Sequence, residues 1–527
     1  MGYDIQVKQP LDEAVEHDST VQTGTMEDLK GDLDDNILRA QGHEAVLIRQ
    51  FSWIAALGLG FSITNSWAGY LSCFGQNLHY GGPFSCIFGL ILAFFAQGTV
   101  TTGLAELASA FPSSGGQYHF CYIVAPEKSR NFFAFVIGWM SVLAWWIVTC
   151  SGLSLIAVTV SGIANFRYPS FVASQWQIYV IYLGACLITI IPVFAIPKKL
   201  SWATQFGLYC SILGCVVWLV VSSAMHQSTN SSALVQQNLG DSGWDGGFAF
   251  VLGIANSMYA YGGTDGVIHI SEEIPRPGRK VPQLMVTTML IGLLTSMPLF
   301  IVLNIFMTDL DAVRTSASPA IEILNQATGN RDVTTFLSVW LLIVFIASLP
   351  SQWIASGRIA WAFARDNGLP LSNFFSHIDT KLEFPVRTTI AALCFASLYG
   401  LLYLASTTAF NSIVTSAVLF LNVTYAVPQG LLLWQGRSKV LPGRYFDLGT
   451  FGLCCNIFAV VWTTFLVVII CSPPALPVAV GSMNYTSVVF VGLSSIVLIL
   501  WVTLGKKKFQ GPTIDWAALQ ASNEISK

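Results

Sequence analysis

Charged residues are scarce in this chain. Only 10% of its 527 residues are Asp, Glu, Lys or Arg, whereas a soluble globular domain carries roughly 25%. Hydrophobic residues make up 54% of the chain, and the mean hydropathy is +0.62. This balance excludes an ordinary soluble domain and predicts an all-α membrane protein that crosses the bilayer many times.

The sequence also lacks the patterns of several functional classes. Most of its eleven cysteines lie inside apolar stretches, with the spacing of neither a secreted disulfide framework nor a metal site. No paired His, Asp and Glu residues gather near a predicted membrane face. We therefore expect neither an enzyme nor a catalytic residue, metal site, cofactor or nucleic-acid partner. No signal peptide is expected at the N-terminus.

Three regions differ in composition. Residues 1–50 are polar and rich in Asp and Glu, which predicts a disordered cytoplasmic tail because such a segment buries little apolar surface. Residues 51–508 form the predicted membrane domain, and residues 509–527 a cytoplasmic C-terminal tail.

A transmembrane helix needs about 20 mostly apolar residues, and about twelve stretches meet this criterion. They are residues 51–72, 83–110, 132–163, 175–195, 203–224, 246–270, 284–307, 333–358, 386–404, 409–433, 449–471 and 485–504. Lys and Arg gather in alternate loops, and the opposite set holds only Arg167, Arg314 and Arg331. This bias predicts that both termini are cytoplasmic. Glycosylation sequons at Asn230 and Asn484 fall in the predicted outer loops.

Two predicted spans contain polar interruptions. The first reads GFSITNSWAGY from Gly60 to Tyr70, and the sixth reads IANSMYAYGGTDG from Ile254 to Gly266. Interruptions at corresponding places in two halves are typical of transporters built on inverted repeats. The two spans run in opposite directions, as a five-plus-five repeat with two further C-terminal helices requires. The alternative is that these small residues only pack neighbouring helices closely.

Four motifs resemble one known family. They are GFSITNSWAGY, the AELASAFPSSGGQY stretch from Ala105, the Glu272–Glu273 pair followed by Pro275, Arg279 and Pro282, and WAFARDNGLP from Trp361. With them, the chain from about Phe51 to Lys508 resembles the fungal amino acid/choline transporter branch of the amino acid–polyamine–organocation superfamily, and most of all its choline permeases.

The resemblance implies a LeuT-type fold and secondary active uptake by alternating access at the plasma membrane. An ion gradient would drive this uptake, and a proton is the first choice of ion, ahead of sodium. The implied partners are membrane lipid, the coupling ion and a small amine-bearing solute. Choline is the first choice. GABA, an amino acid or a polyamine stays open, because Tyr259 to Gly266 looks closer to the GABA and amino-acid permeases. A nutrient sensor on a transporter scaffold is a further alternative.

Candidate site residues come from the interrupted spans and from spans two, three and eight. An aromatic cage around a cation and an intramembrane carboxylate motivate the choice. The predicted solute-binding residues are Ser62, Thr64, Asn65, Trp67, Tyr70, Tyr259, Tyr261, Asp265, Trp145 and Trp353. The predicted ion-coupling or gate residues are Asp265, Ser348, Ser351, Glu106 and Glu273. The Glu272–Glu273 pair is expected to anchor an inner gate against Arg279 or Arg365. Ordinary helix packing is the alternative for each aromatic residue, helix capping is the alternative for Asp265, and an ion pair with a cytoplasmic Arg is the alternative for Glu106.

Overall fold

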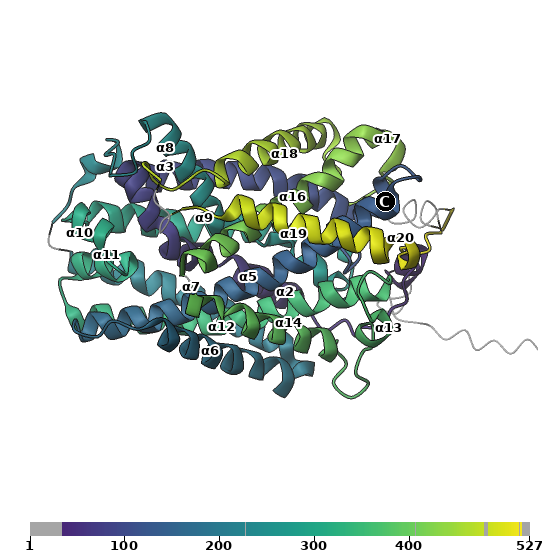
Figure 1. The fold of residues 1–527 in the computed structure, drawn as a ribbon, viewed down its shortest axis with the longest axis horizontal. Coiled ribbons are helices and arrows are strands. Elements are labelled where there is room, and N and C mark those ends of the chain that lie inside the picture. The colour runs from purple at the N-terminus through teal and green to yellow at the C-terminus, as the bar shows by residue number, and fades with distance from the viewer. Residues whose placement is uncertain (1–33, 227, 406, 479–482, 516, 519–527) are drawn as a thin grey trace, which may run out of the picture.

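The computed structural model describes residues 34–226, 228–405, 407–478, 483–515 and 517–518. The described part of the chain is helical, and its long helices run roughly along the longest axis of the molecule (Figure 1). The principal helices are α2 Trp53–Thr64, α3 Ser66–Ala110, α4 Gln117–Val124, α5 Arg130–Arg167, α6 Gln175–Ala195, α7 Leu200–Met225, α8 Gly246–Ser257, α9 Pro277–Ile305, α12 Arg331–Arg365, α14 Val386–Tyr399, α16 Thr407–Gln435, α18 Gly449–Ile470 and α19 Thr486–Leu500.

Shorter elements close the two ends of this bundle. Helices α10 Leu310–Thr315 and α11 Pro319–Thr328 lie at one end, whereas α13 Ser372–Phe375, α17 Arg437–Val440 and α20 Lys506–Lys508 lie at the other (Figure 1). The second end carries the Lys- and Arg-rich loops. Because this charge bias marks the cytoplasmic side of a membrane protein, we call it the inner face and the opposite end the outer face.

Ten helical stretches in the described residues are long and apolar enough to cross a membrane. The count differs from twelve at two places. The first two predicted spans join into one stretch, Trp53–Ala110, although non-helical dihedrals at Gly81 and Gly82 kink α3 there. The sixth predicted span is divided among shorter helices. The remaining predicted spans coincide with long helices, since an apolar run of this length specifies a helix in lipid.

The outer faces of the long helices are apolar. Leu187, Ile188 and Ile191 of α6 are 62%, 57% and 57% exposed, and Val461 and Val468 of α18 are each 64% exposed. A soluble protein rarely leaves large contiguous apolar patches in water. These surfaces therefore suit contact with lipid, and the chain is an all-helical protein with several membrane spans.

The segment before α2 differs from the predicted tail. Residues 1–33 lie outside the described part, but residues 34–50 are packed against the inner face, where Leu38 and Leu47 are buried. The Phe51 amide donates to the carbonyl oxygen of Glu273 at 3.1 Å, and the Asp515 amide donates to the Ala40 carbonyl at 2.8 Å. The tail prediction is therefore wrong for residues 34–50, whose few apolar side chains suffice to dock the segment.

Candidate functional site

The interruption of the first span is a single residue wide. Helix α2 ends at Thr64, Asn65 adopts left-handed dihedrals (φ 35°, ψ 53°), and α3 begins at Ser66. Asn is one of the few non-glycine residues that enter this region at low cost. Its side chain fixes the break, because Asn65 Nδ2 donates to Ser348 Oγ at 2.9 Å and Ser211 Oγ donates to Asn65 Oδ1 at 2.6 Å.

The interruption of the sixth span is longer. Helix α8 is followed by the short 3-10 helix η3 Met258–Tyr261, then by Gly262 and Gly263, and then by the 3-10 helix η4 Thr264–Glu273. Gly263 has a φ of +78°, and a Cβ atom there would lie 2.8 Å from Cγ2 of Ile63. Glycine therefore allows both the left-handed turn and the close approach of the two broken spans.

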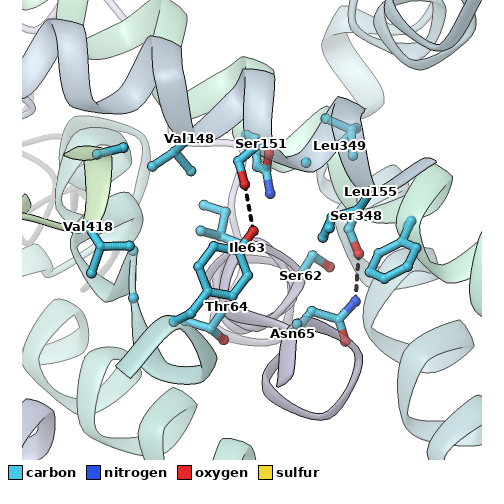
Figure 2. Close-up of a pocket in the computed structure, with 18 of the residues that line it drawn as sticks. Ser62, Ile63, Thr64, Asn65, Val148, Ser151, Leu155, Ser348, Leu349 and Val418 are labelled. Atoms are coloured by element: carbon cyan, nitrogen blue, oxygen red, sulfur yellow. Dashed lines mark hydrogen bonds between the residues drawn. The ribbon is translucent and has the colours of Figure 1, made fainter. Parts of the chain in front are cut away.

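A cavity of about 60 Å³ lies between the two breaks. Side chains from α2, α5, α12 and α16 surround it, and Figure 2 shows Ser348 hydrogen-bonded to Asn65, with Ser62 close by and Ser151 farther along the wall. Since a water molecule needs roughly 10–15 Å³ by this measure, the cavity holds about four to six waters. No described lining residue is charged. The lining combines apolar side chains and the aromatic rings of Tyr259 and Phe345 with hydroxyl and amide groups.

A second cavity of about 820 Å³ leads from this site toward the outer face. Its wall includes Arg314 and Asn484 from the outer loops. It shares four lining residues with the inner cavity, namely Ser151, Leu155, Tyr259 and Val418. The hydroxyl groups of Tyr259 and Ser151 lie 2.7 Å apart. This hydrogen bond joins η3 to α5 where the smaller cavity meets the second one, which we call the outer vestibule.

Asp265 lies between the cavity and the inner face and is fully buried. Its Oδ2 accepts hydrogen bonds from Gln117 Nε2 at 2.6 Å and from Trp145 Nε1 at 3.1 Å. The Tyr425 hydroxyl donates to its Oδ1. His269 Nε2 lies 3.3 Å from Oδ2. Such complete satisfaction by donors is what a buried carboxylate requires.

The hydrogen bonds of His269 indicate where its protons lie. Nδ1 is 3.1 Å from the carbonyl oxygen of Ser114, which only accepts, so Nδ1 carries a proton. A hydrogen bond between Nε2 and Asp265 then needs a second proton. The contact therefore places an imidazole and a carboxylate, two groups that can exchange a proton, within hydrogen-bonding distance of each other.

Three ion-paired groups close the path to the inner face. Glu272 makes a bidentate pair with Arg365, with distances of 3.0 and 2.9 Å. Glu273 pairs with Arg358, whose side chain is fully buried. Glu106 of α3 accepts from Arg437 Nη2 at 2.8 Å and from Arg444 Nε at 2.9 Å. Arg279, the other predicted partner of the glutamate pair, instead lies 4.6 Å over the Tyr445 ring.

The backbone connects Asp265 to this closed face. The Ser114 amide donates to Glu272 Oε1 at 3.1 Å, while the Ser114 carbonyl accepts from His269. One peptide segment thus contacts both the Asp265–His269 pair and the Glu272–Arg365 pair.

The structure brings some predicted residues to the cavity and leaves others away from it. Ser62, Thr64, Asn65, Tyr259 and Ser348 line it. Ser351 follows Ser348 by three residues in α12 and is buried. Its Oγ makes no hydrogen bond to a described residue. Asp265 and Trp145 lie behind the wall, where the indole ring would be 3.7 Å from a Cβ at Gly263.

Four aromatic predictions need correction, because these rings pack between helices instead of lining the cavity. Trp67 donates to Ser211 Oγ at 2.9 Å, and Trp353 donates to Thr189 Oγ1 at 3.0 Å. Tyr70 donates to the Cys86 carbonyl at 2.8 Å, and the Tyr261 hydroxyl lies 3.5 Å from Ser296 Oγ. Their polar atoms are satisfied by neighbouring helices, and any contact of these rings with a solute stays a prediction.

Several site residues have no counterpart among the predictions. Ser151, Phe345 and Gln352 line the cavity, and Gln117 and Tyr425 bind Asp265. Gln117 belongs to the AELASAFPSSGGQY motif, so that motif was a usable signal. The others sit in long apolar runs, where a lone Ser, Gln or Tyr has no distinguishing sequence context.

The two sequons differ in their surroundings. Asn230 is exposed at the start of a short 3-10 helix, Ser231–Leu234. Asn484 Nδ2 instead donates to the backbone carbonyls of Ile470 at 2.6 Å and Ser472 at 2.9 Å. Glycosylation at either site stays a prediction, and modification of Asn484 requires that at least one of the two hydrogen bonds donated by Nδ2 break.

Comparison with known proteins identifies the family of the chain. The amino acid permease family profile matches residues 51–493. The choline transporter of Saccharomyces cerevisiae is 32% identical over 91% of this chain and 85% of its own length. The swainsonine transporter swnT of Arthroderma benhamiae is 29% identical over 90% and 95% of the two chains, and the amino-acid permease BAT1 of Arabidopsis thaliana is 25% identical over 90% and 95%. This chain belongs to the amino acid permease family and is a transporter, not an enzyme.

Proposed function

We propose that the chain imports a small amine-bearing solute, choline first, in symport with a proton across the plasma membrane. The observation that carries this proposal is the uncharged cavity between two broken spans, open to an outer vestibule and closed toward the inner face by buried ion pairs. In a LeuT-type arrangement of twelve spans with a five-plus-five inverted repeat, this corresponds to an outward-facing state of the alternating-access cycle.

The chemistry of the cavity suits a solute that carries a positive charge and no carboxylate group. Tyr259 and Phe345 offer aromatic rings, which attract quaternary ammonium groups, and the backbone around Ile63 and Thr64 is opened at the break. The 32% identity to a choline transporter points the same way.

A zwitterionic amino acid such as GABA is the second candidate, with a polyamine behind it. Asn65 and Gly263, which precede α3 and η4, both line the cavity. The start of a helix presents unpaired amides and a partial positive charge, which would accept a carboxylate. The two candidates thus differ in whether these helix ends or the aromatic rings dominate binding.

The proton is favoured over sodium by two contacts. The Asp265–His269 pair stores a proton on the inner side of the cavity. Ser348 would belong to the alternative site, which would bind a sodium ion. Its Oγ already accepts from the side-chain Nδ2 of Asn65 and donates to the Val344 carbonyl at 2.8 Å. A sodium ion there must first displace an amide donor.

The transport cycle follows from these contacts. The solute enters the cavity from the outer vestibule past Tyr259. Once it has bound, the boundary formed by Tyr259 and Ser151 closes the cavity toward the outer face. Movement of the broken spans separates Glu272 and Glu273 from their arginines and opens the inner face. Water then reaches the Asp265–His269 pair, which releases its proton with the solute.

Expression in a yeast strain deficient in choline uptake tests this assignment. Labelled choline is expected to accumulate at pH 5, to accumulate less at pH 7.5, to be lost with a protonophore and to be indifferent to replacement of Na⁺ by K⁺. Accumulation of GABA, an amino acid or a polyamine without choline would overturn the solute. A requirement for Na⁺ would overturn the coupling ion, and the absence of any accumulation would favour a sensor.

The placement of the aromatic rings predicts unequal effects of two substitutions. Trp67→Phe removes the bond to Ser211 and is expected to lower thermal stability, whereas the solute KM changes less than about twofold, because about 1 kcal/mol of hydrogen bonding is lost away from the cavity. Tyr259→Ala removes a ring from the wall and is expected to raise KM about tenfold. Uptake kinetics and thermal melts of both variants check this. Equal KM shifts in both variants would contradict the placement.

A further inference from the structure

A second cluster of polar side chains lies at the inner face, outside the solute site. His43, His119 and Asp366 are 3%, 0% and 6% exposed, and each offers a ligand atom within 4.8 Å of the other two. They come from the docked segment before α2, from α4, and from the loop after α12. These positions are far apart in the sequence, so spacing gave no indication of the cluster.

His119 lacks any partner in this cluster. Neither of its ring nitrogens makes a hydrogen bond to any residue that the structure describes, although the side chain is fully buried. A neutral imidazole carries a proton on one ring nitrogen and a lone pair on the other, so the buried His119 ring offers an acceptor that no described side chain uses. Buried polar atoms are normally satisfied. An unsatisfied imidazole beside a second one, 5.1 Å away between ring centroids, indicates a missing ligand.

The charges around the cluster favour a cation. Asp366 Oδ1 lies 3.0 Å from His43 Nε2, and its Oδ2 accepts from the Tyr118 hydroxyl at 3.0 Å. Arg365, the adjacent guanidinium, is engaged by Glu272 through both terminal nitrogens. Among the described contacts, the hydrogen-bonded neighbour that offsets the charge of Asp366 is His43, which does so only when it is protonated.

We propose that His43, His119 and Asp366 bind one divalent transition-metal ion, with Zn²⁺ as the representative ion. Two imidazoles and one carboxylate form a common ligand set for Zn²⁺, and remaining positions can hold water or a nearby hydroxyl. On binding, the ion takes the place of the proton between His43 and Asp366 and engages the free nitrogen of His119.

The site would tie together segments that must separate when the inner face opens. His43 belongs to the segment that leads into the broken helix α2, and this segment is also bound to the sixth span through Gln50 Nε2 and Glu273 Oε2 at 2.9 Å. Asp366 follows α12, which carries Arg358 and Arg365. Zn²⁺ arriving from the cytoplasm would therefore hold the inner face closed and inhibit transport.

Metal binding to the purified full chain tests the site without reference to any solute. We expect one Zn²⁺ per chain by isothermal titration calorimetry. In His119→Asn the affinity should fall at least about 100-fold, since loss of outer-shell partners alone costs 10–100-fold. His377→Asn, a change at an exposed histidine of the same face, is the matched control and should bind as the wild type does. Thermal melts verify that both variants fold. Binding that is absent, or unchanged in His119→Asn, overturns the proposal.

The effect on transport is tested in proteoliposomes whose zinc-free uptake has been established with the solute found above. Zn²⁺ trapped at the inner face is expected to inhibit the wild type and His377→Asn but not His119→Asn. This arm rests on the proposed function, whereas the calorimetric arm does not. Stoichiometric binding without inhibition would overturn the locking role.

Discussion

Asp265→Asn is expected to lower proton-driven solute uptake at least about 100-fold. The substitution keeps the shape of the side chain but replaces the carboxylate beside His269 with an amide, which cannot take up or release the coupled proton. Loss of one member of a buried pair destabilises a protein by roughly 3–5 kcal/mol, so thermal melts first establish that the variant folds. Uptake into proteoliposomes along an imposed pH gradient measures the loss.

Solute exchange at equal pH provides the discriminating readout for this variant. Exchange needs no net proton movement, so it should fall less than gradient-driven uptake. Asp332→Asn is the matched control, because Asp332 is an 83% exposed aspartate at the outer end of α12 and surface pairs contribute little. Gradient-driven uptake at wild-type level in Asp265→Asn would refute the coupling role.

Removing one member of the Glu273–Arg358 pair should harm the protein more than removing both. Arg358→Gln leaves the Glu273 carboxylate buried without the guanidinium that pairs with it. Glu273→Gln likewise leaves the Arg358 guanidinium buried without its carboxylate. Each is expected to cost roughly 3–5 kcal/mol. The double variant carries no orphaned charge, so its melting temperature should lie above that of either single variant.

Thermal melts of the three variants measure this coupling directly. Purely additive losses would mean that the two side chains do not depend on each other. Uptake of the double variant adds a second readout, because a neutral inner gate should open more easily than an ion-paired one. We expect the double variant to transport even where it is less stable than the wild type.

Much of the site was predictable because intramembrane polar residues are conspicuous. Asn65 and Asp265 stood out as polar groups within apolar runs, and each bonds its broken span to a neighbouring helix, Asn65 to α12 and Asp265 to α4. The contact between Glu272 and Arg365 was also expected from their loops. Polar and ionisable residues are costly in lipid, so they are rare in membrane spans unless they have a function. Their positions are therefore easy to find in the sequence.

The direction of individual side chains was less predictable. Helical periodicity relates Trp67 to the residues before it only while the helix continues, and the left-handed turn at Asn65 resets that relation. Trp67 therefore faces α7. The cavity side chains Ser151 and Gln352 are equally common as packing residues between helices, so their role depends on a tertiary arrangement that local sequence does not contain.

The boundary formed by Tyr259 and Ser151 has a consequence for inhibitor design. Because the small cavity and the wide vestibule share wall residues, a compound with a compact cationic head and a longer tail would occupy both at once. Tethering makes the second contact intramolecular and raises avidity without new chemistry at the head. Its tail would also wedge the outer wall open, so such a compound would act as a non-transported blocker.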